Sequence, residues 1–185
     1  MFNYSKTEES FDLDCIPFKS FIHLCNLKYL KFCKCMGLSL YQCKILEFAS
    51  FKLKELEFCS NIWGYEFDHL IMKYLGASLQ SLLLDERLTI TIPIIVNLLV
   101  YCPNLITLEI TNCLYIDSLI ISYFKNLITR RLNVIFTKEH SNDEIYTKLA
   151  SNLPIKVKEI SIRTSQQFNT LQFSKILENC KVLNC

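Results

Sequence analysis

Apolar residues recur along this chain with one constant spacing. In the clearest unit, Leu105, Leu108 and Ile110 stand at the first, fourth and sixth positions, and Cys113 stands at the ninth. The pattern repeats every 26 residues, and the first positions of its six units are Leu27, Leu53, Leu79, Leu105, Arg131 and Val157. No insertion interrupts these units, and a seventh begins at Leu183. A constant period of this length predicts a stack of similar structural units.

Each unit predicts a short strand followed by a turn and a helix. We expect strands at residues 29–32, 55–58, 81–84, 107–110, 133–136 and 159–162. We expect helices at residues 40–48, 66–75, 93–101, 117–124, 142–150 and 168–179. Pro93 in a first turn, Asp117 as an N-cap and Gly76 after a helix end favour these bounds. Residues 16–25 predict a helix over the first strand, so residues 1–26 are expected to form a tail and capping helix, and residues 27–185 the repeats.

The motif that these positions form, L-x-x-L-x-L-x-x-N/C, is typical of leucine-rich repeats. The predicted fold is therefore α/β: a curved, right-handed solenoid with a parallel sheet on its concave face and helices on its convex face. A small polar or thiol side chain at the ninth position can bond turn backbone groups that would otherwise be buried without partners. Arg87 and Glu139 depart from the pattern at this position, so we expect either that their turns open toward solvent or that the pattern is degraded there.

Side chains alternate along a strand, so the third, fifth and seventh positions of each unit should point away from the helices. From these positions we select as candidate partner-binding residues Tyr29, Lys31, Glu55, Glu57, Ser81, Leu83, Asp85, Thr107, Glu109, Asn133, Glu159 and Arg163. Among them Glu55, Glu57, Asp85 and Glu109 form an acidic run without a basic member. This run favours recruitment of a basic segment of a partner protein. The alternative is that these residues are only the solvated polar side of an exposed sheet.

The repeats resemble those of one protein family. The cysteine at the ninth position and the lead-ins Cys102-Pro103-Asn104-Leu105 and Asn179-Cys180 before Leu183 are similar to the cysteine-containing leucine-rich repeats of F-box/LRR and antagonist-of-mitotic-exit-network proteins. The resemblance covers residues 16–185 and is strongest in the units that begin at Leu27 and Leu105.

This resemblance implies a substrate-recruiting arc of an SCF-type ubiquitin ligase. In that family an F-box before the repeats binds Skp1, but residues 1–26 do not resemble an F-box. Skp1 and cullin are therefore expected partners only if an F-box lies elsewhere. The alternative is a general interaction scaffold without a ubiquitin role. Because the seventh unit stops at Cys185, we also expect the last repeat to expose apolar surface and to favour association.

Composition limits the other classes of function. A net charge of +2 gives no support for nucleic-acid binding. The longest apolar run, from Leu88 to Tyr101, contains polar residues and is shorter than the roughly 20 residues of a membrane-spanning helix. The 10 cysteines follow the repeat register, and the first residues are too polar for a signal peptide, which favours reduced thiols in the cytoplasm or nucleus.

We expect no enzymatic activity, cofactor or metal. No phosphate-binding loop or nucleophile motif is present, and His69 and His140 stand apart from any catalytic pair. Four residues close in sequence could suggest zinc, namely His23, Cys25, Cys33 and Cys35, but the repeat register places them on different sides of the chain. The compact basic cluster Lys125, Arg130 and Arg131 suits a helix C-terminus. Trp63 and Tyr65 could form a contact on a turn, although packing on the helix below explains them better.

Overall fold

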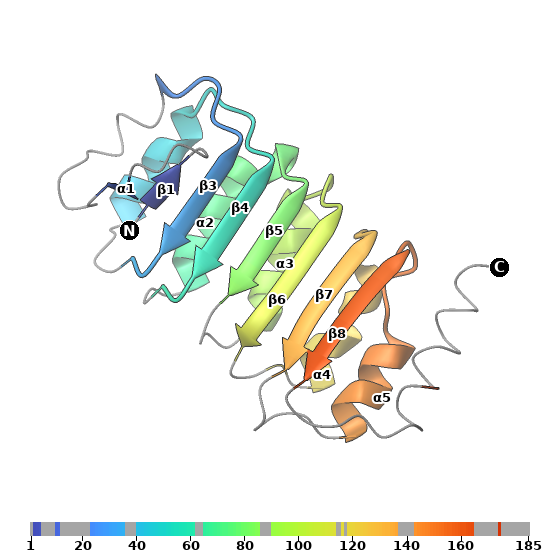
Figure 1. Ribbon diagram of the computed structural model, residues 1–185. Helices are drawn as coiled ribbons and strands as arrows, with labels where there is room; N and C mark the ends of the chain where they lie inside the picture. The colour runs from blue at the N-terminus through green and yellow to red at the C-terminus, as the bar shows by residue number, and fades with distance from the viewer. Residues whose placement is uncertain are drawn as a thin grey trace.

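The fold is α/β, with six parallel strands that alternate with helices in a computed structural model of the chain (Figure 1). The structure describes residues 2–4, 10–11, 23–35, 40–61, 65–85, 90–113, 116, 118–136, 143–164 and 174. The parallel strands lie side by side in chain order, and they are β3 (Tyr29–Cys33), β4 (Glu55–Cys59), β5 (Ser81–Asp85), β6 (Thr107–Cys113), β7 (Arg131–Phe136) and β8 (Glu159–Thr164). Each of the six expected strands is present.

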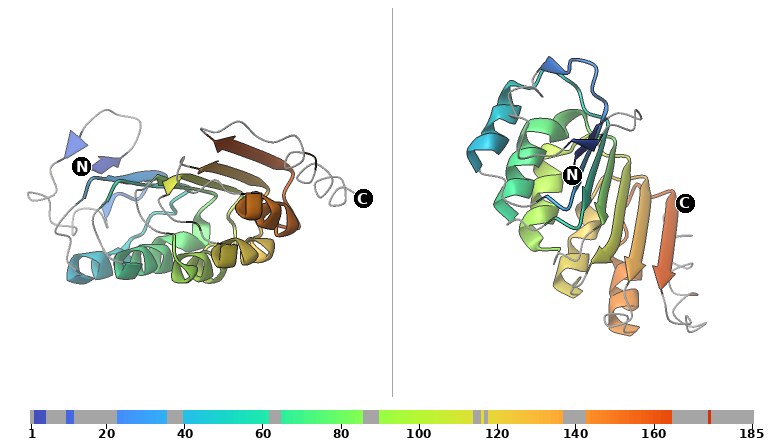
Figure 2. Two further views of the ribbon diagram at one scale, coloured as in Figure 1. Left: turned by 90° about the horizontal axis from the view of Figure 1, so that it is seen from below. Right: turned by 60° about the vertical axis from the view of Figure 1, so that its left-hand side comes forward.

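The described helices all lie on one face of the sheet (Figure 2). They are α1 (Leu40–Lys44), η2 (Ile45–Phe48), α2 (Tyr65–Leu75), η3 (Gly76–Ser78), α3 (Ile92–Tyr101), α4 (Ser118–Ser122), η4 (Phe124–Asn126) and α5 (Asp143–Ser151). These elements confirm five of the expected helices to within a few residues. The sixth, at 168–179, lies outside the described residues except for Ser174.

The core lies between the sheet and the helices, and it consists of side chains that the strand register places in rows. One row contains Leu30, Leu56, Leu82, Leu108 and Leu132, each at most 1% exposed. A second contains Phe32, Phe58, Leu84, Ile110 and Val134, all of them buried. The rings of Phe32 and Phe58 stack with centroids 5.6 Å apart. Burial of like positions on successive strands explains why the apolar pattern repeats along the sequence.

The constant period of 26 is wrong for one unit. Thr107 of β6 pairs with Arg131 of β7, 24 residues further on, and Arg131 pairs with Glu159 of β8, 28 residues further on. The first position of the fifth unit is therefore Thr129, which is 0% exposed, whereas Arg131 is exposed on the sheet. Because a shift of two residues keeps the alternation of side chains, the remaining strand residues still point to the expected faces.

Replacing Thr129 by valine is expected to stabilise the protein by about 1–2 kcal/mol. The Thr129 hydroxyl is buried and has no hydrogen-bond partner, and valine has nearly the same shape without this polar atom. Chemical denaturation of the two proteins measures the difference. Arg131→Leu is the comparison: with a period of 26 it would fill the core and stabilise, whereas the observed register gives little change or a small loss.

The turn after β4 is held by a buried polar side chain, Asn61, at the ninth position of its unit. The side chain of Asn61 is 2% exposed; its Oδ1 accepts a hydrogen bond from the Cys35 amide at 2.9 Å, and its Nδ2 donates one to the Phe32 carbonyl at 3.1 Å. This confirms for Asn61 the role predicted for the ninth position. The residues before Cys35 and Asn61 have left-handed backbone conformations, with φ of 53° at Lys34 and 51° at Ser60. Arg87 and Glu139 lie outside the described residues.

The N-terminal edge of the parallel sheet is covered by two short strands in the region where the sequence predicted a tail. Strand β1 (Phe2–Tyr4) pairs antiparallel with β3, and β2 (Ser10–Phe11) pairs with β1. This pairing satisfies backbone groups that an uncovered edge strand would expose. The capping helix expected at 16–25 lies outside the described residues up to residue 22, and residues 23–25 form part of a turn.

Candidate functional site

The sheet has one face that no described helix covers, and we call it the open face (Figure 2). Its side chains form three rows across the six strands. The first row is Tyr29, Glu55, Ser81, Thr107, Arg131 and Glu159. The second row is Lys31, Glu57, Leu83, Glu109, Asn133 and Ser161. The third row begins with Cys33, Cys59, Asp85 and Thr111, and after a register irregularity in β6 it continues with Ile135 and Arg163.

All twelve candidate partner-binding residues lie on the open face. They are half-buried or exposed, as the alternation along each strand requires. Arg131 also lies on this face, but it is not among the candidates, because the 26-residue period placed it in the core. The structure thus brings the candidates together on one surface, and their role in binding stays a prediction.

An ion pair neutralises one end of the acidic run. Lys31 Nζ lies 2.8 Å from Glu57 Oε2, and both side chains are about a quarter exposed, at 27% and 25%. The hydrogen bond to Glu57 raises the pKa of Lys31 despite partial burial. Burial, with the negative charge of Glu57 added, raises the pKa of Tyr29 to about 12, so its phenol stays protonated near neutral pH. Lys31 therefore compensates the charge of Glu57, and the end of the acidic run near β3 is less negative than the sequence suggests.

Three other acids of the open face, Asp85, Glu109 and Glu159, contact neutral or basic neighbours. Thr111 Oγ1 donates to Asp85 Oδ1 at 2.8 Å, and Asn133 Nδ2 lies 3.4 Å from Glu109 Oε2. Arg131 and Glu159, both largely exposed, pair at 3.0 Å between Nε and Oε2. Thr111 and Asn133 are neutral, so these two contacts do not cancel the charges of Asp85 and Glu109. With the exposed Glu55, these two residues make the middle of the open face negative.

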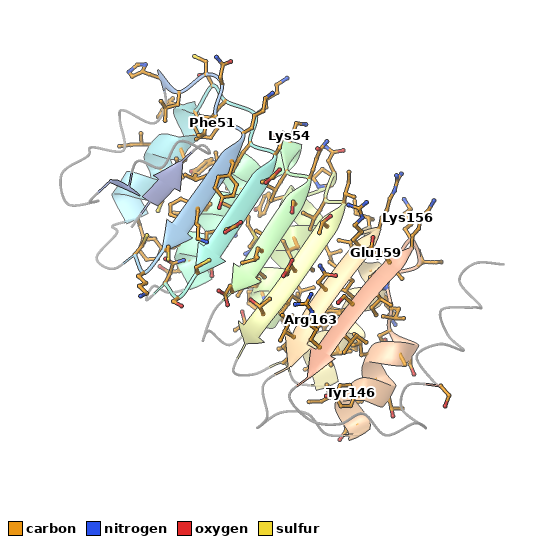
Figure 3. The ribbon with its side chains drawn as sticks, viewed as in Figure 1. Phe51, Lys54, Tyr146, Lys156, Glu159 and Arg163 are labelled. Carbon is orange, nitrogen blue, oxygen red and sulfur yellow. The ribbon has the colours of Figure 1, made fainter. Side chains whose placement is uncertain are left out.

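A groove lies outside the open face, at the edge of the sheet where β4 to β8 begin. It has a volume of about 790 Å³, and its lining includes four basic residues, Lys52, Lys54, Arg130 and Lys156. Figure 3 shows Lys54 and Lys156 along this edge, with Arg163 and Tyr146 toward the opposite edge. The predicted basic cluster is therefore divided: Arg130 lines the groove, Arg131 lies on the open face, and Lys125 lies in η4.

The alternative chemical sites do not assemble from the described residues. His69 is part-buried between helices, with Nδ1 3.0 Å from Asn97 Oδ1 and its ring edge-on to Tyr101. Within the described ranges, no group of three His, Cys, Asp or Glu residues has the geometry of a metal site. The side chains of Trp63 and Tyr65 and all of His140 lie outside the description.

The described cysteines whose state is resolved are free thiols. Four of them are buried, namely Cys35, Cys43, Cys59 and Cys102, while Cys25 is exposed and Cys33 lies half-buried on the open face. Burial raises the pKa of Cys59 to about 11 and that of Cys102 to about 12, so both thiols stay protonated near neutral pH. Cys35, Cys43 and Cys102 pack in the core as small apolar side chains, as the repeat predicted for Cys35 and Cys102, whereas Cys59 is buried on the open face.

Comparison with known proteins gives no family assignment: no family model matches the chain, and no curated protein matches it. Among the described helices, none combines the length and the apolar character needed to span a lipid bilayer.

Proposed function

We propose that this chain is a leucine-rich-repeat solenoid that acts as a non-catalytic protein-recognition module. The observation that carries the proposal is the open face: six strands in register present two complete rows of half-buried and exposed side chains, with every described helix on the other side. In a solenoid the helix side is wider than the strand side, so this face would be concave and would fit a convex or extended partner. Protein recognition uses such surfaces through a few central contacts and a polar rim.

The bound segment is expected to be basic. Glu55, Asp85 and Glu109 lie on three neighbouring strands, so three carboxylates stand close together in the middle of this face. Complementary charge steers association and disfavours acidic partners. Leu83 lies between Glu57 and Glu109 in the second row and supplies an apolar contact at the centre.

Reversing two charges on this face tests the proposal. Glu55→Lys with Glu109→Lys is expected to weaken binding of short peptides rich in Lys and Arg by about tenfold at low salt, as measured by fluorescence anisotropy. The matched control is Glu47→Lys with Glu66→Lys, which makes the same charge change at exposed residues on the helix side. The proposal is wrong if wild type binds no such peptide, or if the control pair weakens binding equally.

The more specific role is recruitment of substrates to an SCF-type ubiquitin ligase, in the cytoplasm or nucleus. It is supported by the similarity of the repeat units to those of F-box/LRR proteins, and the buried free thiols suit a reducing compartment. A pull-down with purified Skp1 and cullin separates this role from that of a general interaction scaffold. Capture favours the ligase role, and failure of the folded chain to bind Skp1 favours the scaffold.

A further inference from the structure

The groove at the strand-start edge carries uncompensated positive charge. Lys52, Arg130 and Lys156 are exposed and Lys54 is half-buried. None of the four takes part in an ion pair among the described residues, and none of the residues that line the groove is acidic. Cations gathered in a depression whose lining contains no acidic residue raise the local positive potential. The groove is thus opposite in charge to the middle of the open face.

The cations lie at the two ends of the groove. Lys52 and Lys54 precede β4, whereas Arg130 precedes β7 and Lys156 precedes β8. Strands β4 and β7 are three steps apart, which is about 14 Å at about 4.8 Å per step. An extended peptide rises about 3.4 Å per residue, so a segment of about four to six residues would connect the two ends.

The rest of the groove lining is neutral and partly apolar. Ile106 lies just before β6, between the two basic ends, and Ile128, which is 38% exposed, lies just before Arg130. Ser78 Oγ donates to the Leu53 carbonyl at 2.8 Å, and Asn104 Nδ2 donates to the Ala77 carbonyl at 2.8 Å. These bonds link lining residues to neighbouring units of the chain and hold part of the groove in place before any ligand binds. A preformed site lowers the entropy lost on binding.

We propose that this groove binds an extended acidic segment of a protein partner, with acidic residues at both ends and apolar residues between them. This site goes beyond the recognition role of the open face and does not depend on it. The basic residues at both ends of the groove and the apolar surface between them are complementary to such a peptide. A nucleic acid fits less well, because single-stranded binding sites present a series of aromatic faces for the bases. Among the lining residues, Phe51 is 6% exposed and Tyr74 is the other aromatic residue.

The test uses a fluorescein-labelled peptide of sequence EEDLIDEE and the full chain. We expect saturable binding that weakens with salt, and weaker binding of LIEEDDEE, which has the same composition but its apolar residues at one end. Lys54→Glu with Lys156→Glu reverses one charge at each end and is expected to reduce affinity by about tenfold or more. The control Lys44→Glu with Lys125→Glu makes the same charge change at exposed helix-side residues and should alter affinity by less than about twofold.

Circular dichroism and thermal unfolding first establish that both double variants are folded. The proposal is overturned if wild-type protein does not bind the peptide, if the two double variants lose equal affinity, or if LIEEDDEE binds as well as EEDLIDEE. It is also overturned, in favour of a phosphate-binding groove, if a labelled oligouridine binds more tightly than the peptide and the Lys54 and Lys156 variant abolishes that binding.

Discussion

Asn61→Ala is expected to lower the free energy of unfolding by about 2–5 kcal/mol. The substitution removes the acceptor of the Cys35 amide and the donor to the Phe32 carbonyl, and both of these hydrogen bonds are buried. A buried polar group left without a partner costs about 1–3 kcal/mol, and here there are two. Urea denaturation followed by circular dichroism measures the change.

Asn104→Ala is the matched control for this prediction. Asn104 also links two units through a side-chain hydrogen bond, but it is exposed, so water can replace its contact with the Ala77 carbonyl. We expect a loss of about 1 kcal/mol or less. Equal losses for the two variants would show that Asn61 does not hold the turn in the manner described.

Phe58→Ala is expected to destabilise the protein by about 3–5 kcal/mol. Phe58 is 1% exposed and its ring stacks on Phe32, so truncation leaves a cavity between the sheet and the helices in addition to the lost apolar burial. The loss should appear as a lower midpoint of denaturation at an unchanged slope.

Phe48→Ala gives the comparison with an equal change in side-chain volume. Phe48 lies in η2 and is 71% exposed, so its truncation should change stability by about 0.5 kcal/mol or less. A large effect at Phe48 together with a small effect at Phe58 would mean that the layer between sheet and helices is not the core.

The sequence predicts much of this fold because one structural unit repeats. The apolar rows are periodic, so Leu56, Leu82 and Leu108 can be aligned by position alone, and the structure pairs them as neighbours. Alternation along each strand then predicts the open face, and it does so even for β7, where the register shifts by two. The polar turn residue Asn61 is predictable for the same reason, since a buried turn needs a partner for its backbone groups.

Other features depend on details that a period cannot supply. Thr129 is a poor match to an apolar position, so the pattern favoured Arg131 and hid the shorter fifth unit. The ion pair between Lys31 and Glu57 requires knowledge of which residues face each other across two strands. The antiparallel pairing of β1 with β3 is not periodic, and no repeat signal could reveal it.

The basic groove was missed because its residues flank the apolar positions. Lys52 and Lys54 stand on either side of Leu53, while Arg130 follows Thr129 and Lys156 precedes Val157. In the sequence Lys52 and Lys156 are about a hundred residues apart, and Arg130 groups with Lys125 and Arg131 as a basic cluster. All four cations flank the first position of a unit. With Thr129 as the first position of the fifth unit, they align along one edge of the sheet.

Both proposed surfaces depend on the order and register of the six parallel strands, and methyl NOEs in a leucine- and valine-labelled sample test this register most directly. The observed register predicts NOEs from Leu108 to Leu82 on one side and to Leu132 on the other. NOEs from Leu108 to Val134 in place of Leu132, or the lack of any contact between Leu82 and Leu108, would contradict the strand register and both surfaces built on it.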